Sequence, residues 1–306
     1  MSTAPVLITG ATGFLGAWII ARLVEKGRAV VATDVSDDFH RLSAINPALP
    51  DRRVMFRHCD VTDAGQIEKI LAETQPSAII HLAALQIPQC RANPAVGARV
   101  NVLGHINMFE AARRQQVRRL VYTSSVAAKP RGPANAPANL YGVFKKADEE
   151  IARLYWEDHR LPSLGLRPHI VYGVGRDAGE TSAITAAIRA AALDEPYEMP
   201  FRTKSCFQYA GDVAEIFARA ALSDWEGARL ADLTARVETT DDIIAAIRAA
   251  VPQARITQAA ESRLSPVEGF ETEQLEQVIG DLPLTSLTEG VARTVDLFRR
   301  NAAVVG

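Results

Sequence analysis

The feature that most constrains this chain is a glycine-rich turn close to its start. The apolar run Val6–Thr9 leads into Gly-Ala-Thr-Gly-Phe-Leu-Gly, and an amphipathic stretch follows and closes at Gly27. The first glycine permits a tight turn, the second lets backbone approach a diphosphate, and the third lets helix and strand pack closely. Free N–H groups at the helix N-terminus favour a bound anion. The turn therefore predicts a dinucleotide diphosphate contacted by Gly10, Thr12, Gly13, Phe14, Leu15 and Gly16.

Short β-type runs alternate with helical patterns through the first half of the chain. The helical patterns cover residues 64–74, 95–116 and Leu140–His159. The runs predicted as further strands are Ala29–Thr33, Val54–His58, Ala78–Leu82, Leu120–Ser124 and Leu164–Arg167. Strands that alternate with crossover helices form a parallel sheet covered on both faces. We therefore predict the α/β class, a doubly wound parallel sheet (Rossmann fold).

After Gly173 the pattern loosens. Helices are expected at 182–193, Asp212–Leu222, 240–250 and after Ser286, with strands at Cys206–Tyr209, Leu230–Thr234 and Arg255–Gln258. The polar segment 259–284 is expected to be a surface excursion. This part is too short to bury a large core alone. We predict a cofactor domain at 1–172 and a smaller C-terminal substrate-binding lobe at 173–306, with 206–235 partly returning to the first domain.

A carboxylate, Asp34, stands at the end of the second predicted strand, where it can accept both ribose hydroxyls and repel a 2′-phosphate. Glycines that served only as turn residues would not need this carboxylate. Arg41 is the next cation along the chain, with two aspartates between, so we predict NAD rather than NADP. Asp60, which also fits a loop cap, is assigned to the cofactor with Val61, and the fourth strand end adds Leu82, Ala83 and Ala84.

A serine, a tyrosine and a lysine form the predicted catalytic group. Ser124 and Ser125 end the fifth strand, and Tyr141 and Lys145 share one face of the next helix at i and i+4 spacing. Tyrosine is a poor base at neutral pH because its unperturbed pKa is about 10. An adjacent ammonium lowers that pKa. Tyr141 can then take a proton from a substrate hydroxyl as hydride leaves for the cofactor, while a serine holds the same oxygen.

Composition and charge exclude several classes of function. The 306 residues include 34 basic and 36 acidic ones, a net charge of −2, so no global basic field favours nucleic acid or an anionic membrane. The three cysteines form no CxxC pair and the histidines no metal-binding spacing, so no metal site is expected. No apolar stretch reaches the roughly 18 residues of a membrane span. We expect a cytoplasmic protein whose partner is a small-molecule substrate.

Together these motifs resemble the extended short-chain dehydrogenase/reductase family, also called the NAD-dependent epimerase/dehydratase family. The resemblance extends through the Leu-Arg-Pro and Val-Tyr-Gly segments at 166–173 to Asp-Val-Ala at 212–214. It implies that Ser125 is the catalytic serine, that Asn101 supports a proton-relay water, and that Pro168 lies beside the nicotinamide.

The resemblance also implies a homodimer. In such family members the helices at about 95–116 and 140–159 pair into a four-helix bundle. Apolar surface on the second helix is expected from Phe144, Ile151, Leu154 and Tyr155.

The chain departs from family members that act on nucleotide-sugars. Those proteins usually carry a diphosphate-binding arginine where this chain has Ser205, and their second such arginine has no clear counterpart. Lys204 or Arg202 match poorly as substitutes, and the stretch between Ser125 and Tyr141 is short and proline-rich. The resemblance is therefore closer to members that oxidise small sugars or sugar acids.

The expected substrate is a small sugar, sugar acid or polyol-like molecule. Arg176, if it is not simply a solvated loop residue, can hold a carboxylate in a bidentate pair. The alternatives are a nucleotide-sugar 4-epimerase or dehydratase with tightly bound NAD, and a non-enzymatic NAD sensor. The predicted substrate contacts are Gln86, Ser125, Arg176 and Thr181.

Overall fold

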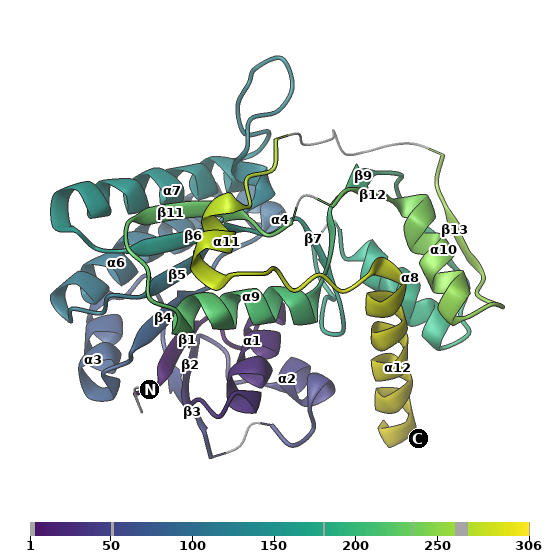
Figure 1. Cartoon of the computed structure of the whole chain (residues 1–306), viewed down its shortest axis with the longest axis horizontal. Coiled ribbons are helices and arrows are strands. Elements are labelled where there is room, and N and C mark those ends of the chain that lie inside the picture. Colours follow the sequence, from purple (N-terminus) through teal and green to yellow (C-terminus); the bar gives the residue numbers. More distant parts are fainter. Residues whose placement is uncertain (1–3, 50–51, 180, 235, 261–268, 306) are drawn as a thin grey trace.

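A seven-stranded parallel sheet forms the centre of the molecule (Figure 1), in a computed structural model that describes residues 4–49, 52–179, 181–234, 236–260 and 269–305. The strand order is β11-β6-β5-β4-β1-β2-β3, and every neighbouring pair is parallel. The predicted doubly wound α/β class is confirmed. The strands are β1 (Val6–Thr9), β2 (Val30–Asp34), β3 (Val54–His58), β4 (Ala78–His81), β5 (Leu120–Thr123), β6 (Ser163–Arg167) and β11 (Ala228–Asp232).

Helices cover both faces of this sheet (Figure 1). Alternate residues of β1 enter different cores: Val6 and Ile8 belong to the core on one face of the sheet, and Leu7 belongs to the core on the other. A strand buried on both sides has a continuous apolar sequence, which is why β1 and β4 could be recognised as strands in the sequence. One face carries α1 (Phe14–Glu25), α2 (His40–Ile45) and α9 (Ala210–Leu222); the other carries α3 (Ala64–Thr74), α6 (Gly104–Arg114) and α7 (Leu140–His159).

The helix expected over 95–116 is divided into three pieces. A short α5 (Pro94–Ala98) leads through a π-helix, η1 (Arg99–Leu103), into α6. Before it lies α4 (Ile87–Ala92), and a 3-10 helix, η2 (Val126–Ala128), follows β5. These short elements all stand at the carboxyl edge of the sheet, the edge at which open α/β sheets bind ligands.

A second, smaller core lies beside the sheet, where α8 (Ala183–Ala192), α10 (Thr240–Ala250) and α12 (Leu287–Val305) pack together (Figure 1). The backbone N–H of Glu289 donates to Ser286 Oγ at the start of α12. Three two-stranded pairs complete this part: β7 (Ile170–Tyr172) with β10 (Phe207–Tyr209), β9 (Lys204–Ser205) with β12 (Glu238–Thr239), and β8 (Tyr197–Met199) with β13 (Ile256–Gln258).

The segment 259–284 is more than a surface excursion. Residues 261–268 lie outside the described residues, but α11 (Glu273–Ile279) packs on α9 and β11 and buries Leu275 completely. The Glu271 backbone N–H donates to the buried carboxylate of Asp232 at the end of β11. This part of the expectation was wrong because the partners of this short helix lie far away in the sequence.

Candidate active site

One pocket of about 950 Å³ opens at the carboxyl edge of the sheet. It is lined by the glycine turn, by the ends of the sheet strands and, on its far side, by the loop after β7 and by β9. Every residue that the sequence assigned to cofactor or substrate lines this pocket, as do Ser125, Tyr141 and Lys145. Asn101 is the exception. The structure thus brings together side chains from across the first two-thirds of the chain.

The glycine turn leaves the N-terminus of α1 open to the pocket. Gly10 has φ +67°, and a Cβ atom there would lie 2.9 Å from the Ala83 backbone nitrogen, so a tight turn and a close approach both need glycine. The N-cap of α1, Gly13, makes no side-chain capping bond, and the first turn of α1 carries no acidic residue. An uncapped helix N-terminus with no acidic residue in its own first turn fits a bound diphosphate.

Asp34 stands where the ribose of a dinucleotide is expected. Its Oδ2 accepts from the backbone N–H and the hydroxyl of Thr12, at 3.0 and 2.8 Å, and its Oδ1 accepts from the Val35 N–H at 2.8 Å. These bonds orient the carboxylate against the turn. Asp60 both lines the pocket and caps its own loop, because Oδ1 accepts from the Thr62 N–H at 2.8 Å.

The strand end at Leu82–Ala84 is held by Thr9 of β1. The Thr9 hydroxyl oxygen accepts from the N–H groups of Leu82 and Ala83, both at 3.2 Å, and lies 2.7 Å from His81 Nδ1. Burial, and then the charge of Lys145, lowers the pKa of His81 to about 3. His81 is therefore a neutral structural residue below the pocket.

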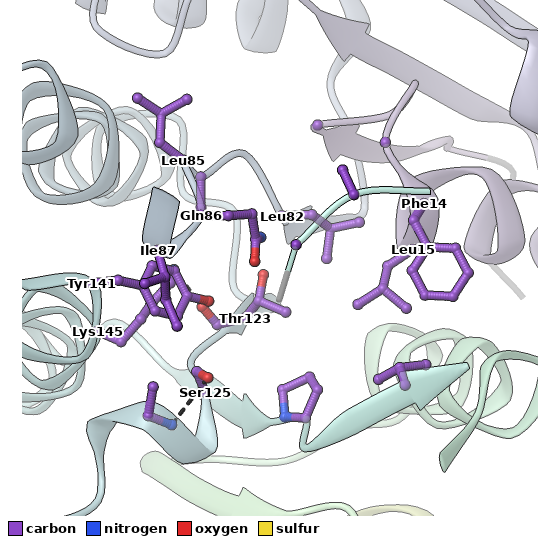
Figure 2. A pocket seen from close by; sticks show the side chains of 18 of the residues that line it. Phe14, Leu15, Leu82, Leu85, Gln86, Ile87, Thr123, Ser125, Tyr141 and Lys145 are labelled. Atoms are coloured by element: carbon purple, nitrogen blue, oxygen red, sulfur yellow. Dashed lines mark hydrogen bonds between the residues drawn. The ribbon is translucent and has the colours of Figure 1, made fainter. Parts of the chain in front are cut away.

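Tyr141 and Lys145 face the pocket from the first turns of α7, opposite Phe14 and Leu15 of α1 (Figure 2). Asn139 caps this helix, its Oδ1 accepting from the Gly142 N–H at 2.9 Å. A Cβ atom at Gly142 would lie 3.0 Å from the Ala127 carbonyl carbon, so glycine lets α7 approach η2. Tyr141 is thereby placed beside the turn that begins at Ser125.

Lys145 is buried, with 4% of its surface exposed. Its Nζ donates to the Thr123 carbonyl at 2.7 Å and to Asp148 Oδ2 at 3.2 Å. Because an ammonium has three N–H donors, one remains for the pocket. Burial raises the pKa of Asp148 to about 7, against the opposing effect of the Lys145 charge.

The two serines after β5, Ser124 and Ser125, have different environments. The Ser124 hydroxyl is buried and donates to Glu149 Oε1 at 2.6 Å. Ser125 begins η2, and its Oγ accepts from the Ala127 N–H at 3.1 Å, the dashed line of Figure 2. The Ser125 proton stays available for a ligand in the pocket. The geometry supports the choice of Ser125, whose catalytic role stays a prediction.

Asn101 does not line the pocket, although its predicted role, support of a proton-relay water, requires it to. It lies in η1, is 1% exposed, and its side chain clamps Leu85: Oδ1 accepts from the Leu85 N–H at 2.7 Å, and Nδ2 donates to the Leu85 carbonyl at 3.0 Å. Leu85 precedes Gln86, which points into the pocket (Figure 2). The structure therefore gives Asn101 the position of a residue that orients this loop.

Arg176 is partly buried in the loop after β7. Its Nη2 donates to Thr181 Oγ1 at 3.3 Å, and its guanidinium lies 5.8 Å from the centre of the Phe14 ring. Its Nε is buried and has no hydrogen-bond partner among the described residues. Burial lowers the pKa of Arg176, and nearby Tyr141 opposes that shift. The pocket thus holds a cation, near Tyr141, with an unused donor.

Sequence reasoning missed several pocket-lining side chains. Arg131 comes from the proline-rich segment before α7, and its Nε is also buried without a partner among the described residues. His169 lies 3.3 Å from Asp232 Oδ1 and packs on Phe270. No local pattern marks these residues. Of the two basic residues weighed as diphosphate ligands, Lys204 lines the pocket and Arg202 does not.

In the part of the chain that the structure describes, no three His, Cys, Asp or Glu side chains gather as a metal site would require. No helix among the described residues is long and apolar enough to cross a membrane.

Comparison with known proteins decides the family. The model of the NAD dependent epimerase/dehydratase family matches residues 6–230. The chain belongs to this family. The predicted family is confirmed, and with it the NAD cofactor and the assignment as an enzyme.

Two UDP-glucose 4-epimerases align with this chain along nearly their whole lengths. A UDP-glucose 4-epimerase of Mycolicibacterium smegmatis is 29% identical over 97% of this chain and 99% of its own. The structure of Thermus thermophilus UDP-glucose 4-epimerase with NAD is 25% identical, with a TM-score of 0.79 over 96% of this chain and 99% of that one. An L-threonine dehydrogenase of Clostridium difficile is 19% identical with a TM-score of 0.82, over 98% and 99% of the two chains, and shows the same fold.

Proposed function

We propose that the protein is an NAD-dependent oxidoreductase that transfers hydride at a hydroxyl-bearing carbon of a small anionic sugar, sugar acid or polyol-like substrate. The observation that carries this proposal is the placement of Tyr141, Lys145 and Ser125 on one wall of the pocket, facing the open N-terminus of α1.

The residues of this chain would hold the cofactor and handle the proton. Asp34 would bind the adenosine ribose, the glycine turn the diphosphate, and Lys145 the nicotinamide ribose. NAD, when bound, supplies the hydride acceptor. Tyr141 takes the substrate hydroxyl proton, its phenolate being stabilised by the adjacent ammonium. Ser125 donates its hydroxyl proton to the same oxygen, while its Oγ accepts from the Ala127 N–H.

The anionic character of the substrate is supported by two unpaired donors on arginines that line the pocket. Arg176 Nε and Arg131 Nε are both buried, and neither has a partner among the described residues. A buried donor left without a bond costs about 1–3 kcal/mol, more when charged. A carboxylate can accept from a guanidinium in a bidentate pair and removes that cost. We therefore place a substrate carboxylate at Arg176.

Nucleotide-sugar 4-epimerisation is the second candidate. It is favoured by the full-length similarity to UDP-glucose 4-epimerases, which supports it above a dehydrogenase of unspecified sugars. The side chains argue the other way, because Ser205 lines the pocket where the resemblance expects a diphosphate-binding arginine. A diphosphate needs charge-assisted partners, and Lys204 is the cation nearest to Ser205 in sequence.

One assay separates these candidates. The purified full chain is incubated with NAD or NADP and with uronates, aldonates, free sugars and nucleotide-sugars, and both NADH absorbance and sugar products are followed. We expect NADH to accumulate in step with an oxidised sugar acid, with NAD only. Interconversion of UDP-glucose and UDP-galactose without net NADH would instead establish the epimerase.

We further propose that the chain has two domains. Residues 1–172 bind the cofactor, and residues 173–306 close the substrate side of the pocket. Residues 206–235 belong partly to the first domain. Edge strand β11 and helix α9, which pack on the main sheet, support that return. The cytoplasmic location stays a prediction.

A homodimer is also proposed. Support comes from exposed apolar side chains on η1 and α7: Leu103, Val143 and Leu154 are 41%, 46% and 45% exposed. Phe144 contributes less than expected, since its ring would lie 3.1 Å from a Cβ atom at Gly97. Tyr155 packs on Phe109. A monomeric mass at micromolar concentration would contradict the dimer.

A further inference from the structure

An ion pair fastens a loop of the substrate side to the cofactor side of the pocket. Arg41 of α2 binds Asp177 of the loop after β7 in a bidentate manner: Nε donates to Oδ2 and Nη2 to Oδ1, each at 3.0 Å. The remaining nitrogen, Nη1, donates to the Thr12 carbonyl of the glycine turn at 3.3 Å. Such a pair fixes both groups in one plane. The Arg41 guanidinium is therefore held against the turn, with one N–H of each of its three nitrogens in use.

Thr12 connects this ion pair to Asp34, the carboxylate expected to bind the adenosine ribose. Its N–H and hydroxyl donate to Asp34, while its carbonyl accepts from Arg41. Asp34 and Arg41 therefore share Thr12 as a neighbour, and both line the pocket. The other lysines and arginines that line the pocket among the described residues come from elsewhere, namely Arg131, Lys145, Arg176 and Lys204.

A dinucleotide with a 2′-phosphate needs a cation close to the ribose-binding carboxylate. Arg41 is the described pocket-lining cation bonded to the glycine turn, and it is already neutralised by Asp177. We propose that Asp177 is a determinant of cofactor choice: from the far side of the pocket it engages Arg41 and withholds this cation from a 2′-phosphate. Asp34 repels the phosphate directly, and Asp177 removes the group that would compensate. The proposal rests on the NAD cofactor and is independent of the substrate.

The loop that carries Asp177 has a second anchor. The Trp18 indole N–H donates to the Val174 carbonyl at 2.9 Å, and this bond is buried. Asp177 itself is half exposed and Arg41 one-quarter exposed, so replacing either side chain opens no core. Asp177→Asn therefore changes the charge facing Arg41 while Trp18 keeps the loop in place.

The test is calorimetric titration of the full chain with NAD and with NADP. Asp177→Asn is expected to lower the ratio of the NADP Kd to the NAD Kd about tenfold, chiefly through tighter NADP binding, because a freed guanidinium makes charge-assisted bonds to phosphate. Asp38→Asn is the control for a carboxylate near Arg41, since Asp38 does not line the pocket and hydrogen-bonds to His40 and not to Arg41. We expect that ratio to stay within about threefold, as for an exposed pair.

A double variant identifies the group responsible. Arg41→Ala combined with Asp177→Asn should return the ratio to the wild-type value, because no cation is then released. The proposal is overturned if Asp177→Asn leaves the ratio unchanged, if Asp38→Asn lowers it equally, or if the gain persists without Arg41. Turnover is not measured, so failure of the sugar-acid assignment would leave this result intact.

Discussion

On the cofactor side of the pocket the polar groups bond to one another, whereas on the substrate side several buried donors have no partner. Thr9 binds two backbone N–H groups, and Asp34 is fixed by Thr12. Across the pocket, Arg131 Nε, Arg176 Nε and Thr203 Oγ1 are buried without partners among the described residues. Native proteins rarely leave buried polar groups unpaired. The contrast indicates a preformed cofactor site facing a substrate site that an acceptor-rich ligand completes.

The largest effect is expected from Tyr141→Phe, which removes the proton acceptor and nothing else. Turnover should fall about 10²–10⁴-fold, while the NAD Kd, measured by calorimetry, stays within about twofold because the glycine turn and Asp34 are untouched. Tyr155→Phe, on the same helix but bonded to Glu110, serves as the control and should retain turnover. Undiminished turnover of the Tyr141 variant would refute the assignment.

Replacing Ser124 and Ser125 separately should distinguish a residue that acts in catalysis from one that stabilises the fold. Ser125→Ala removes a donor to the reacting oxygen and should lower kcat about 10²-fold. Ser124→Ala removes the bond to Glu149 and should lower the free energy of unfolding by about 1–2 kcal/mol with little change in kcat. Steady-state kinetics and urea unfolding report the two effects, and the reverse pattern would exchange the two assignments.

Gly10→Ala tests whether cofactor binding needs the close approach of the glycine turn to the backbone of Ala83. The substitution forces a side chain into a φ of +67° and a Cβ atom to 2.9 Å from the Ala83 nitrogen. We expect a loss of about 1–3 kcal/mol in stability and a roughly tenfold rise in the NAD Kd. Gly132→Ala, also at positive φ but with open space around it, is the control for the backbone effect alone. Equal NAD affinity in both variants would break the close-fit argument.

A last effect, on stability alone, concerns Asp148, a buried residue beneath the cofactor side whose Oδ1 has no partner among the described residues. Burial raises its pKa from 3.8 to about 7, so between these values the folded protein holds a proton that the unfolded chain releases. The contribution of this proton to the free energy of unfolding is therefore complete at low pH and is lost as pH rises toward the folded-state pKa. Between about pH 5 and 7 the unfolding free energy should fall by about 2 kcal/mol.

Urea unfolding at several pH values measures how the unfolding free energy depends on pH. In Asp148→Asn this dependence should be weaker over the same range. An unchanged slope in that variant would assign the pH dependence to another group.

Much of the cofactor side could be predicted from the sequence because its signals are local. The glycine turn, Asp34 and the Tyr141–Lys145 spacing each lie within one strand–turn–helix unit. The helix at 64–74 likewise carries its cap next to it, with Asp63 accepting from the Gln66 N–H. Inner strands such as β1 and β4 show as apolar runs because both of their faces are buried.

The substrate side depends on contacts that local patterns do not contain. The Arg41–Asp177 pair joins residues 136 positions apart. No visible break in the apolar stripe of the sequence marks the π-helix at Asn101, whose side chain bonds to Leu85. Arg176 and Arg131 look like any loop arginine until burial and missing partners set them apart.

The central claim is that the substrate side selects a small anion while the cofactor side is complete alone. The most direct measurement is the ratio of kcat/KM for a hexuronate to that for the matched neutral hexose, in the wild type and in Arg176→Gln. A charged hydrogen bond predicts a ratio of about 10–100 in the wild type that collapses toward one in the variant, with NAD affinity unchanged. A ratio near one in the wild type, or one that survives Arg176→Gln, would contradict the account.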